Sequence, residues 1–191
     1  MGRLILVLGG ARSGKSDFAQ RLAKELGGDK VVFVATAEAR DEEMQRRIEV
    51  HRQTRPPGWK TAEAPRRVGE AVQALGAGAR VVLVDCVTLL VSNTVLALGE
   101  SPEAVAAEAA VTGEVRALLD ACRESTATFI VVSNEVGLGL VPDNPLGRLY
   151  RDLLGQVNQT LAAQASAVYL LVAGLPLEIK SMTRYGRTTP R

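Results

Sequence analysis

The chain has 191 residues, 47% of them hydrophobic and 23% charged, which is typical of one globular domain with a substantial core. Its 23 basic and 21 acidic residues leave a formal charge of +2, too balanced to indicate a nucleic-acid or membrane surface. The two cysteines, Cys86 and Cys122, lack metal-binding or redox spacing, so we expect free thiols and a cytoplasmic protein. No apolar stretch has the length of a membrane span, and we expect no membrane anchor.

Short apolar runs rich in β-branched residues recur along the chain and predict buried parallel strands. The segments between them have helical spacing, as over residues 18–26 and 146–161. This alternation predicts a three-layer α/β fold, in which helices flank a mainly parallel sheet. The expected strands lie at residues 4–8, 31–35, 81–84, 129–132 and 168–172.

A further helix is expected over residues 101–125, which are rich in Ala and Glu. It would begin with Ser101 as its N-cap and Pro102 at its first position. No repeat, low-complexity tract or long linker divides the chain, so we expect one P-loop catalytic domain over residues 1–180. Residues 181–191 are polar and basic without periodicity, which predicts a mobile C-terminal tail.

A phosphate-binding motif directly follows the first expected strand. The segment Gly9-Gly10-Ala11-Arg12-Ser13-Gly14-Lys15-Ser16 has the Walker A pattern and also its context, between a strand and a helix. Backbone N–H groups and the helix dipole would bind phosphate oxygens there. Lys15 would supply a catalytic positive charge toward the β and γ phosphates. The structural alternative is a glycine-rich turn.

Asp85 ends the expected strand at residues 81–84, where a Walker B carboxylate would stand. We expect Ser16 and Asp85 to hold Mg²⁺ with a bound triphosphate. The structural alternative is an Asp that caps the next turn. No Asn-Lys-x-Asp element for guanine occurs in the chain, so these motifs favour a kinase or transferase over a GTPase switch.

Loops at the carboxyl ends of parallel strands gather at one edge of a sheet. We therefore expect the phosphate loop, Asp85 and residues 36–37, 134–135 and 173–174 to lie together, although they are scattered in sequence.

The chain has a single histidine, His51, in a charged segment with helical spacing. Met44, Ile48 and His51 would share one face of that helix. Periodicity alone favours a packed or solvated histidine over a nucleophile.

The sequence resembles the bifunctional adenosylcobinamide kinase and adenosylcobinamide-phosphate guanylyltransferase family of cobalamin biosynthesis along nearly its whole length. It departs from the family at Leu90, where an aromatic residue is frequent, and at Ser166-Ala167, which lack a common Asp. Besides the phosphate loop, the matching segments are Ala35-Thr36-Ala37-Glu38, residues 41–44, Arg47-Ile48, His51-Arg52, Arg55-Pro56, Trp59, Thr61, Glu63, Val84-Asp85-Cys86, residues 133–137, Val141-Pro142, residues 146–148 and 150–152, Asn158-Gln159 and residues 172–176.

The resemblance implies a RecA-like sheet, a homotrimer and two reactions. ATP or GTP would phosphorylate adenosylcobinamide, and GTP would then donate GMP to adenosylcobinamide phosphate, giving adenosylcobinamide-GDP and pyrophosphate. The histidine at position 51 would carry GMP as a covalent intermediate. Beside the phosphate loop, the implied GTP site consists of Thr36, Ala37, His51, Arg52, Gln53, Thr54, Glu63 and Asp85.

The two reactions attack different phosphorus atoms, γ for the kinase and α for the guanylyltransferase. We therefore expect the helix bearing His51 to move on the loops at residues 27–28 and 56–58. Two other functions stay open on the motifs: a P-loop small-molecule kinase with one activity, in which His51 is dispensable, and a non-catalytic nucleotide-dependent binding module.

Overall fold

The computed structural model describes residues 2–39, 42–53 and 55–182, apart from the side chains of Glu43, Met44, Arg47, Val50 and His51. Within these residues seven strands form one sheet in the order β3-β2-β4-β5-β1-β6-β7. Neighbouring strands are parallel, except that β7 runs antiparallel to β6. The strands are β1 Arg3–Gly9, β2 Val31–Ala35, β3 Lys60–Glu63, β4 Val81–Asp85, β5 Thr128–Asn134, β6 Ala167–Val172 and β7 Leu175–Glu178.

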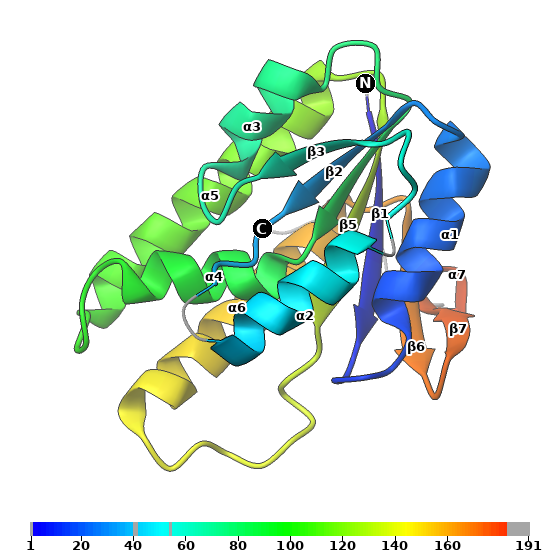
Figure 1. The fold of residues 1–191 in the computed structure, drawn as a ribbon. Coiled ribbons are helices and arrows are strands. Elements are labelled where there is room, and N and C mark those ends of the chain that lie inside the picture. Colours follow the sequence, from blue (N-terminus) through cyan, green and yellow to red (C-terminus); the bar gives the residue numbers. More distant parts are fainter. Residues whose placement is uncertain (1, 40–41, 54, 183–191) are drawn as a thin grey trace.

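Helices cover both faces of the sheet (Figure 1). Helices α3, α4, α5 and α6 pack on one face, together with the Leu4 and Leu6 side chains of β1. Helix α1 packs on the other face with Ile5 and Val7, because successive strand residues point to opposite sides. This confirms the three-layer α/β fold. The helices are α1 Lys15–Gly27, α2 Glu42–Gln53, α3 Val68–Leu75, α4 Val87–Leu96, α5 Ala104–Glu124, α6 Pro145–Gln164 and α7 Ile179–Met182.

All five strands expected from apolar runs are confirmed, and two others were missed. Strand β3 lies at the sheet edge, with three of its four residues exposed, and β7 is exposed over most of its length. Such edge strands need no apolar pattern. Helix α4 was also missed, because it is apolar and buried on nearly all sides and shows no helical periodicity.

The expected start of the long helix at Ser101 is wrong. Helix α5 begins at Ala104, and its N-cap position is Glu103, whose side chain makes no capping hydrogen bond. Ser and Pro also favour turns, and here Ser101 and Pro102 lie in the connection between α4 and α5. At the other end of the chain, Ser181 belongs to α7, so helical structure enters the expected tail. Residues 183–191 lie outside the described part.

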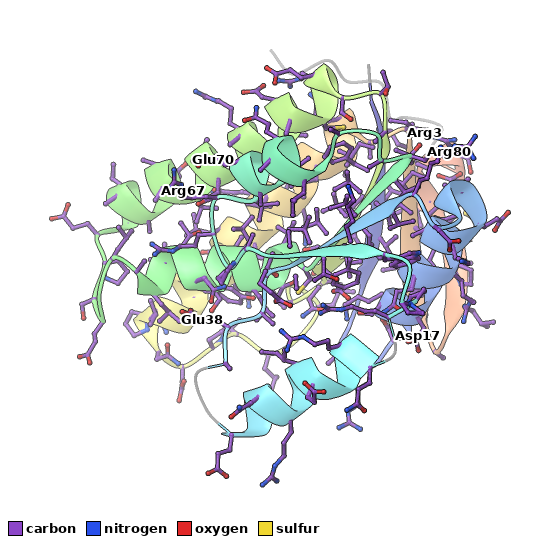
Figure 2. All side chains as sticks on the ribbon, turned by 45° about the horizontal axis from the view of Figure 1, so that its top comes forward. Arg3, Asp17, Glu38, Arg67, Glu70 and Arg80 are labelled. Atoms are coloured by element: carbon purple, nitrogen blue, oxygen red, sulfur yellow. The ribbon has the colours of Figure 1, made fainter. Side chains whose placement is uncertain are left out.

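Different charged residues lie near the amino ends and the carboxyl ends of the strands. In Figure 2, Arg3 and Arg80 lie near the amino ends of β1 and β4, whereas Asp17 and Glu38 follow the carboxyl ends of β1 and β2. Helix α2 lies along this carboxyl edge (Figure 1). Among the helices of the described residues, none combines the length and apolar character needed to cross a membrane.

Candidate active site

The phosphate loop joins β1 to α1 and is shaped by backbone hydrogen bonds. The Ser13 N–H donates to the Gly10 carbonyl at 3.3 Å, and the Ser13 carbonyl accepts from the Gly174 N–H at 3.0 Å. Gly14 stands directly before α1 with φ +87°, a backbone conformation that favours glycine. The N-terminus of α1 therefore faces the loop with its free N–H groups, as anion binding requires.

Gly9 leaves no room for a side chain. A Cβ there would lie 2.4 Å from Ser13 Oγ and 2.9 Å from the backbone oxygen of Leu171, whereas a Cβ at Gly10 would meet no atom within 4 Å. We expect Gly9→Ala to lower the free energy of unfolding by about 1 to 3 kcal/mol. The matched Gly10→Ala variant should change it by no more than about 0.5 kcal/mol. Urea unfolding measures both, and equal stabilities would contradict the steric argument.

Lys15 is held inside the loop. Its side chain is largely buried, and Nζ donates to the Gly10 carbonyl at 3.0 Å. Burial lowers the pKa of Lys15, while the nearby Cys86 and Asp85 oppose this shift. The loop and its neighbours thus place one cationic donor where phosphate oxygens would bind.

Thr36 fixes the turn that follows Asp85. Its hydroxyl donates to the Cys86 carbonyl at 2.7 Å and accepts from the Cys86 N–H at 2.8 Å. The Thr36 N–H donates to the Asp85 carbonyl at 3.2 Å, and Asn93 Nδ2 donates to the Thr36 carbonyl at 2.8 Å. The Asp85–Cys86 peptide bond is cis. This network sets the position of the Asp85 carboxylate at the sheet edge.

Both cysteines are free, as expected. Cys86 borders the Asp85 turn, and burial, together with the Asp85 charge, raises the pKa of its thiol to about 11. The thiolate is the reactive form of cysteine, so this shift disfavours Cys86 as a nucleophile.

A pocket of about 290 Å³ opens at the carboxyl edge, between the phosphate loop, β4 and α2. The grouping expected from the strand ends is therefore real for residues of the phosphate loop, β2, β4 and β5. The polar residues that line the pocket are Lys15, Ser16, Arg55, Asp85, Thr88 and Asn134. The other lining residues are Phe33, Ala35, Ala37, Ile48, Cys86 and Leu89.

Ser16 and Asp85 offer a hydroxyl and a carboxylate to the same pocket. Both are oxygen ligands of the kind that Mg²⁺ takes, with phosphate oxygens and water completing the coordination. The described residues contain no group of three or more His, Cys, Asp or Glu that could hold a metal alone. The residue types thus fit a Mg²⁺ ion that arrives with a triphosphate.

Two arginines converge on Glu63 beside this pocket. The Arg52 Nη2 lies 3.0 Å from Glu63 Oε1, and the Arg55 Nη1 lies 3.5 Å from the same oxygen. The Arg55 side chain is 8% exposed, and its guanidinium carbon lies 4.1 Å from the centre of the Phe33 ring. Glu63 and Phe33 therefore hold Arg55 at the pocket wall, as a cation stacked on an aromatic face.

Comparison with known proteins decides the family. The model of the family described as "Cobinamide kinase / cobinamide phosphate guanyltransferase" matches residues 5–179. The chain belongs to this family. It is 41% identical over 182 residues to the bifunctional adenosylcobalamin biosynthesis protein CobU of Salmonella typhimurium, covering 93% of this chain and 99% of that protein. It is 42% identical to CobU of Escherichia coli with the same coverage, and 43% identical over 175 residues to the bifunctional adenosylcobalamin biosynthesis protein CobP of Pseudomonas aeruginosa, covering 92% and 96%.

The resemblance to the cobinamide kinase family implied a set of GTP-site residues. In the structure, some of these residues line the pocket and others do not. Lys15, Ser16, Ala37 and Asp85 line the pocket. Thr36 does not line it, since it is fully buried and its hydroxyl is bonded to the backbone of Cys86. Thr36 therefore lies behind the pocket, where its hydrogen bonds hold the turn that follows Asp85.

Helix α2 brings further expected residues to the same edge. Ile48 lines the pocket, and the backbone of His51 is three residues further along, on the same helix face. Arg52 pairs with Glu63, and Gln53 Nε2 donates to Glu49 Oε1 at 3.0 Å on the outer surface of α2. The His51 side chain and the whole of Thr54 lie outside what the structure describes.

The expected hinge at residues 27–28 is wrong. Between Gly28 and α2 the chain forms β2, which is paired with β3 on one side and β4 on the other. A turn before a strand fixed in the sheet cannot act as a joint for a helix after it. In addition, Trp59 Nε1 donates to the Gly28 carbonyl at 3.0 Å, and the Trp59 side chain is buried. Any joint of α2 must lie between β2 and β3.

Some pocket residues were not among those proposed for the site from the sequence. Phe33, Thr88 and Leu89 face the pocket only because β2, β4 and α4 meet there. Their residue types carry no chemical signal. Asn134 was placed at the carboxyl edge by the position of its strand, and that signal could have marked it as a site residue.

Proposed function

We propose that this chain catalyses two successive transfers in cobalamin biosynthesis. In the first, ATP or GTP phosphorylates adenosylcobinamide. In the second, GTP donates GMP to adenosylcobinamide phosphate, which yields adenosylcobinamide-GDP and pyrophosphate. The observation that supports this proposal most is one pocket that joins the phosphate loop and Asp85 with α2, the helix of the chain's single histidine.

The proposed guanylyl transfer passes through His51. An imidazole nitrogen attacks the α phosphorus of GTP, the bond to the β-phosphate oxygen breaks, and pyrophosphate leaves with the electron pair. A phosphate oxygen of the corrin substrate then attacks the same phosphorus, and the nitrogen–phosphorus bond breaks. Two in-line displacements thus replace one difficult transfer.

The residues of the pocket have distinct proposed roles. Lys15 and the loop N–H groups bind the β and γ phosphates, and Arg55 lies at the wall to bind a phosphate oxygen. Ser16 and Asp85 would hold Mg²⁺, which neutralises charge on the phosphates when it is bound. Arg52 and Gln53 of α2, with Ala37, Thr54 and Glu63 nearby in sequence or space, would complete the GTP site.

The test uses GTP labelled at the α phosphate, with separation of the protein under denaturing conditions. We expect wild type to retain label that survives base and is released by acid, as a phosphoramidate does, and His51→Ala to retain none. GTP labelled at the γ phosphate should leave the protein unlabelled. If His51→Ala retains as much label as wild type, His51 is not the nucleophile, and the small-molecule kinase with one activity becomes the better interpretation.

The proposed assembly is a homotrimer in the cytoplasm, with the corrin and the nucleotides as its partners and no nucleic acid. Sedimentation equilibrium of the purified chain measures the assembly directly. A monomer or dimer would rule out the trimer without affecting the two reactions.

A further inference from the structure

The connection from β5 to α6, residues 135–144, leaves the sheet beside the candidate nucleotide pocket. Asn134, the last residue of β5, lines that pocket, and the next residue, Glu135, donates its N–H to the Gly9 carbonyl of the phosphate loop at 3.1 Å. The connection extends past the carboxyl ends of the strands (Figure 1). A molecule that enters the pocket from this side therefore lies against the connection.

Both ends of the connection are fixed to the rest of the protein. At its start, Val136 packs against the hydrophobic core, and Glu135 Oε1 accepts from the Gly137 N–H at 2.6 Å. At its end, Arg148 Nη1 donates to the Asp143 carbonyl at 2.7 Å. The residues between these two ends are thus presented from anchored positions.

The middle of the connection presents apolar side chains to solvent. Leu138 is 87% exposed, Leu140 is 96% exposed and Val141 is 64% exposed. Leu138 and Leu140 are the most exposed large hydrophobic residues in the part of the chain that the structure describes. A single exposed apolar side chain is common, but three within four consecutive residues beside a pocket indicate a surface that a ligand or partner covers.

The corrin ring of the proposed substrate is the ligand that best fits this surface. The hydroxyl of adenosylcobinamide must reach the phosphoryl group bound at the phosphate loop, but the ring that carries it is a large macrocycle. The pocket has a volume of about 290 Å³, which is small for a ligand site, and the nucleotide occupies it. The ring must therefore lie outside, where contact between its apolar faces and leucine side chains removes apolar surface from water.

Helix α2, which also borders the pocket, offers no comparable surface. Among its side chains that the structure describes, all are charged or polar except Ile48, which lines the pocket itself. An apolar ring on this helix would cover exposed charged groups such as Arg46 and Glu49 and take them out of water. The connection between β5 and α6 is therefore the better support for the ring.

On the basis of the proposed function, we propose that Leu138, Leu140 and Val141 form the surface that binds the corrin ring in both reactions. The ring packs on these side chains while its reacting group extends into the pocket. That group is the hydroxyl in the kinase reaction and the phosphate in the guanylyl transfer. The three residues thus determine the affinity for the corrin, and none of them lines the nucleotide pocket.

The experiment replaces two of these side chains by polar ones and measures binding of the corrin directly. Equilibrium dialysis, followed by the visible absorption of the corrin, gives the Kd of adenosylcobinamide, and the steady-state kinase assay gives its KM. We expect the double variant Leu138→Ser/Leu140→Ser to raise both constants by about 10- to 100-fold, because burial of two leucine side chains is lost. Covalent labelling by α-labelled GTP involves no corrin and should proceed at the wild-type rate.

Two control variants separate apolar contact from other effects. Leu138→Met/Leu140→Met keeps apolar side chains of similar size and should bind the corrin nearly as tightly as wild type. Met182→Ser removes an exposed apolar side chain from α7, which follows β7 near the amino end of β6, and should leave both constants unchanged.

Each outcome has a distinct meaning. Wild type that makes neither product overturns the proposed function, and this inference with it. With an active wild type, an unchanged corrin Kd in Leu138→Ser/Leu140→Ser overturns the inference alone. Loss of corrin binding together with GTP labelling, or with the subunit assembly seen by sedimentation, would make the connection a structural or subunit contact and also overturn it. If the double variant does not fold, Leu140→Ser decides, with an expected increase in Kd of about tenfold.

Discussion

Replacing Lys15 by Met should lower both phosphoryl transfer and GMP transfer by about 10²- to 10³-fold, because both reactions lose one preorganised cationic donor. The stability of the Lys15→Met variant should not decrease, although its activity does. Lys15 is buried, and burial lowers its pKa, which means that the fold disfavours its charged form. Met is an unbranched side chain that can fill the same space without carrying a charge. We therefore expect an unchanged or higher melting temperature.

The matched control for this variant is Lys24→Met on the same helix. The Lys24 side chain is 53% exposed, and its Nζ lies 2.6 Å from Asp29 Oδ1. Along α1, Lys24 is far from the pocket residues Lys15 and Ser16. Exposed ion pairs contribute little, so this variant should keep its activity and its stability. Steady-state assays of both half-reactions and thermal unfolding give the answer. A Lys15→Met enzyme with wild-type turnover would remove Lys15 from the catalytic machinery.

Thr36→Val should be among the most destabilising single substitutions at the site. The change keeps the shape of the side chain but removes the hydroxyl that bonds to both the N–H and the carbonyl of Cys86. Thr36 is fully buried, so these two backbone groups lose a hydrogen-bond partner out of reach of water. We expect a loss of about 2 to 4 kcal/mol in the free energy of unfolding. In a chain of this size, the melting temperature should fall by roughly 4 to 16 °C.

Thr94→Val provides the control, since Thr94 is also buried and its hydroxyl donates only to the Leu90 carbonyl, one turn earlier in α4. That carbonyl is a helical acceptor with a backbone donor of its own, so the loss should stay below about 1 kcal/mol. Urea unfolding curves of both variants measure the difference. Equal losses would show that the Thr36 hydroxyl does not anchor the Asp85 turn.

Much of the candidate site could be predicted because its signals are local. The phosphate loop requires a fixed order of glycines, Lys15 and Ser16. Asp85 follows a short run of apolar, β-branched residues, which favours a buried strand. The parallel sheet then brings loop and carboxylate together, since all carboxyl ends lie at one edge. The pocket that contains Lys15, Ser16 and Asp85 confirms that reasoning.

Predictions about Thr36 and the hinge needed long-range information. Thr36 matches the family pattern, but its hydroxyl faces Cys86, 50 residues away in sequence. The glycines at residues 27–28 suggested a hinge, but strand β2, which follows them, is paired with β3 on one side and β4 on the other. Strands β3 and β7 were missed for a related reason, because exposed edge strands are defined by their neighbours and not by their own hydrophobicity.

The class of fold, the phosphate loop and the family could be inferred from the amino-acid order alone, because a spaced motif and alternating apolar runs are properties of consecutive residues. Which side chains meet depends on the tertiary structure. It placed Arg55 on the Phe33 ring, put Thr36 behind the Asp85 turn, and set Asn134 between Gly9 and Asp85. Such contacts arise from strand order and register, which join residues far apart in the chain and leave no mark on their local sequence.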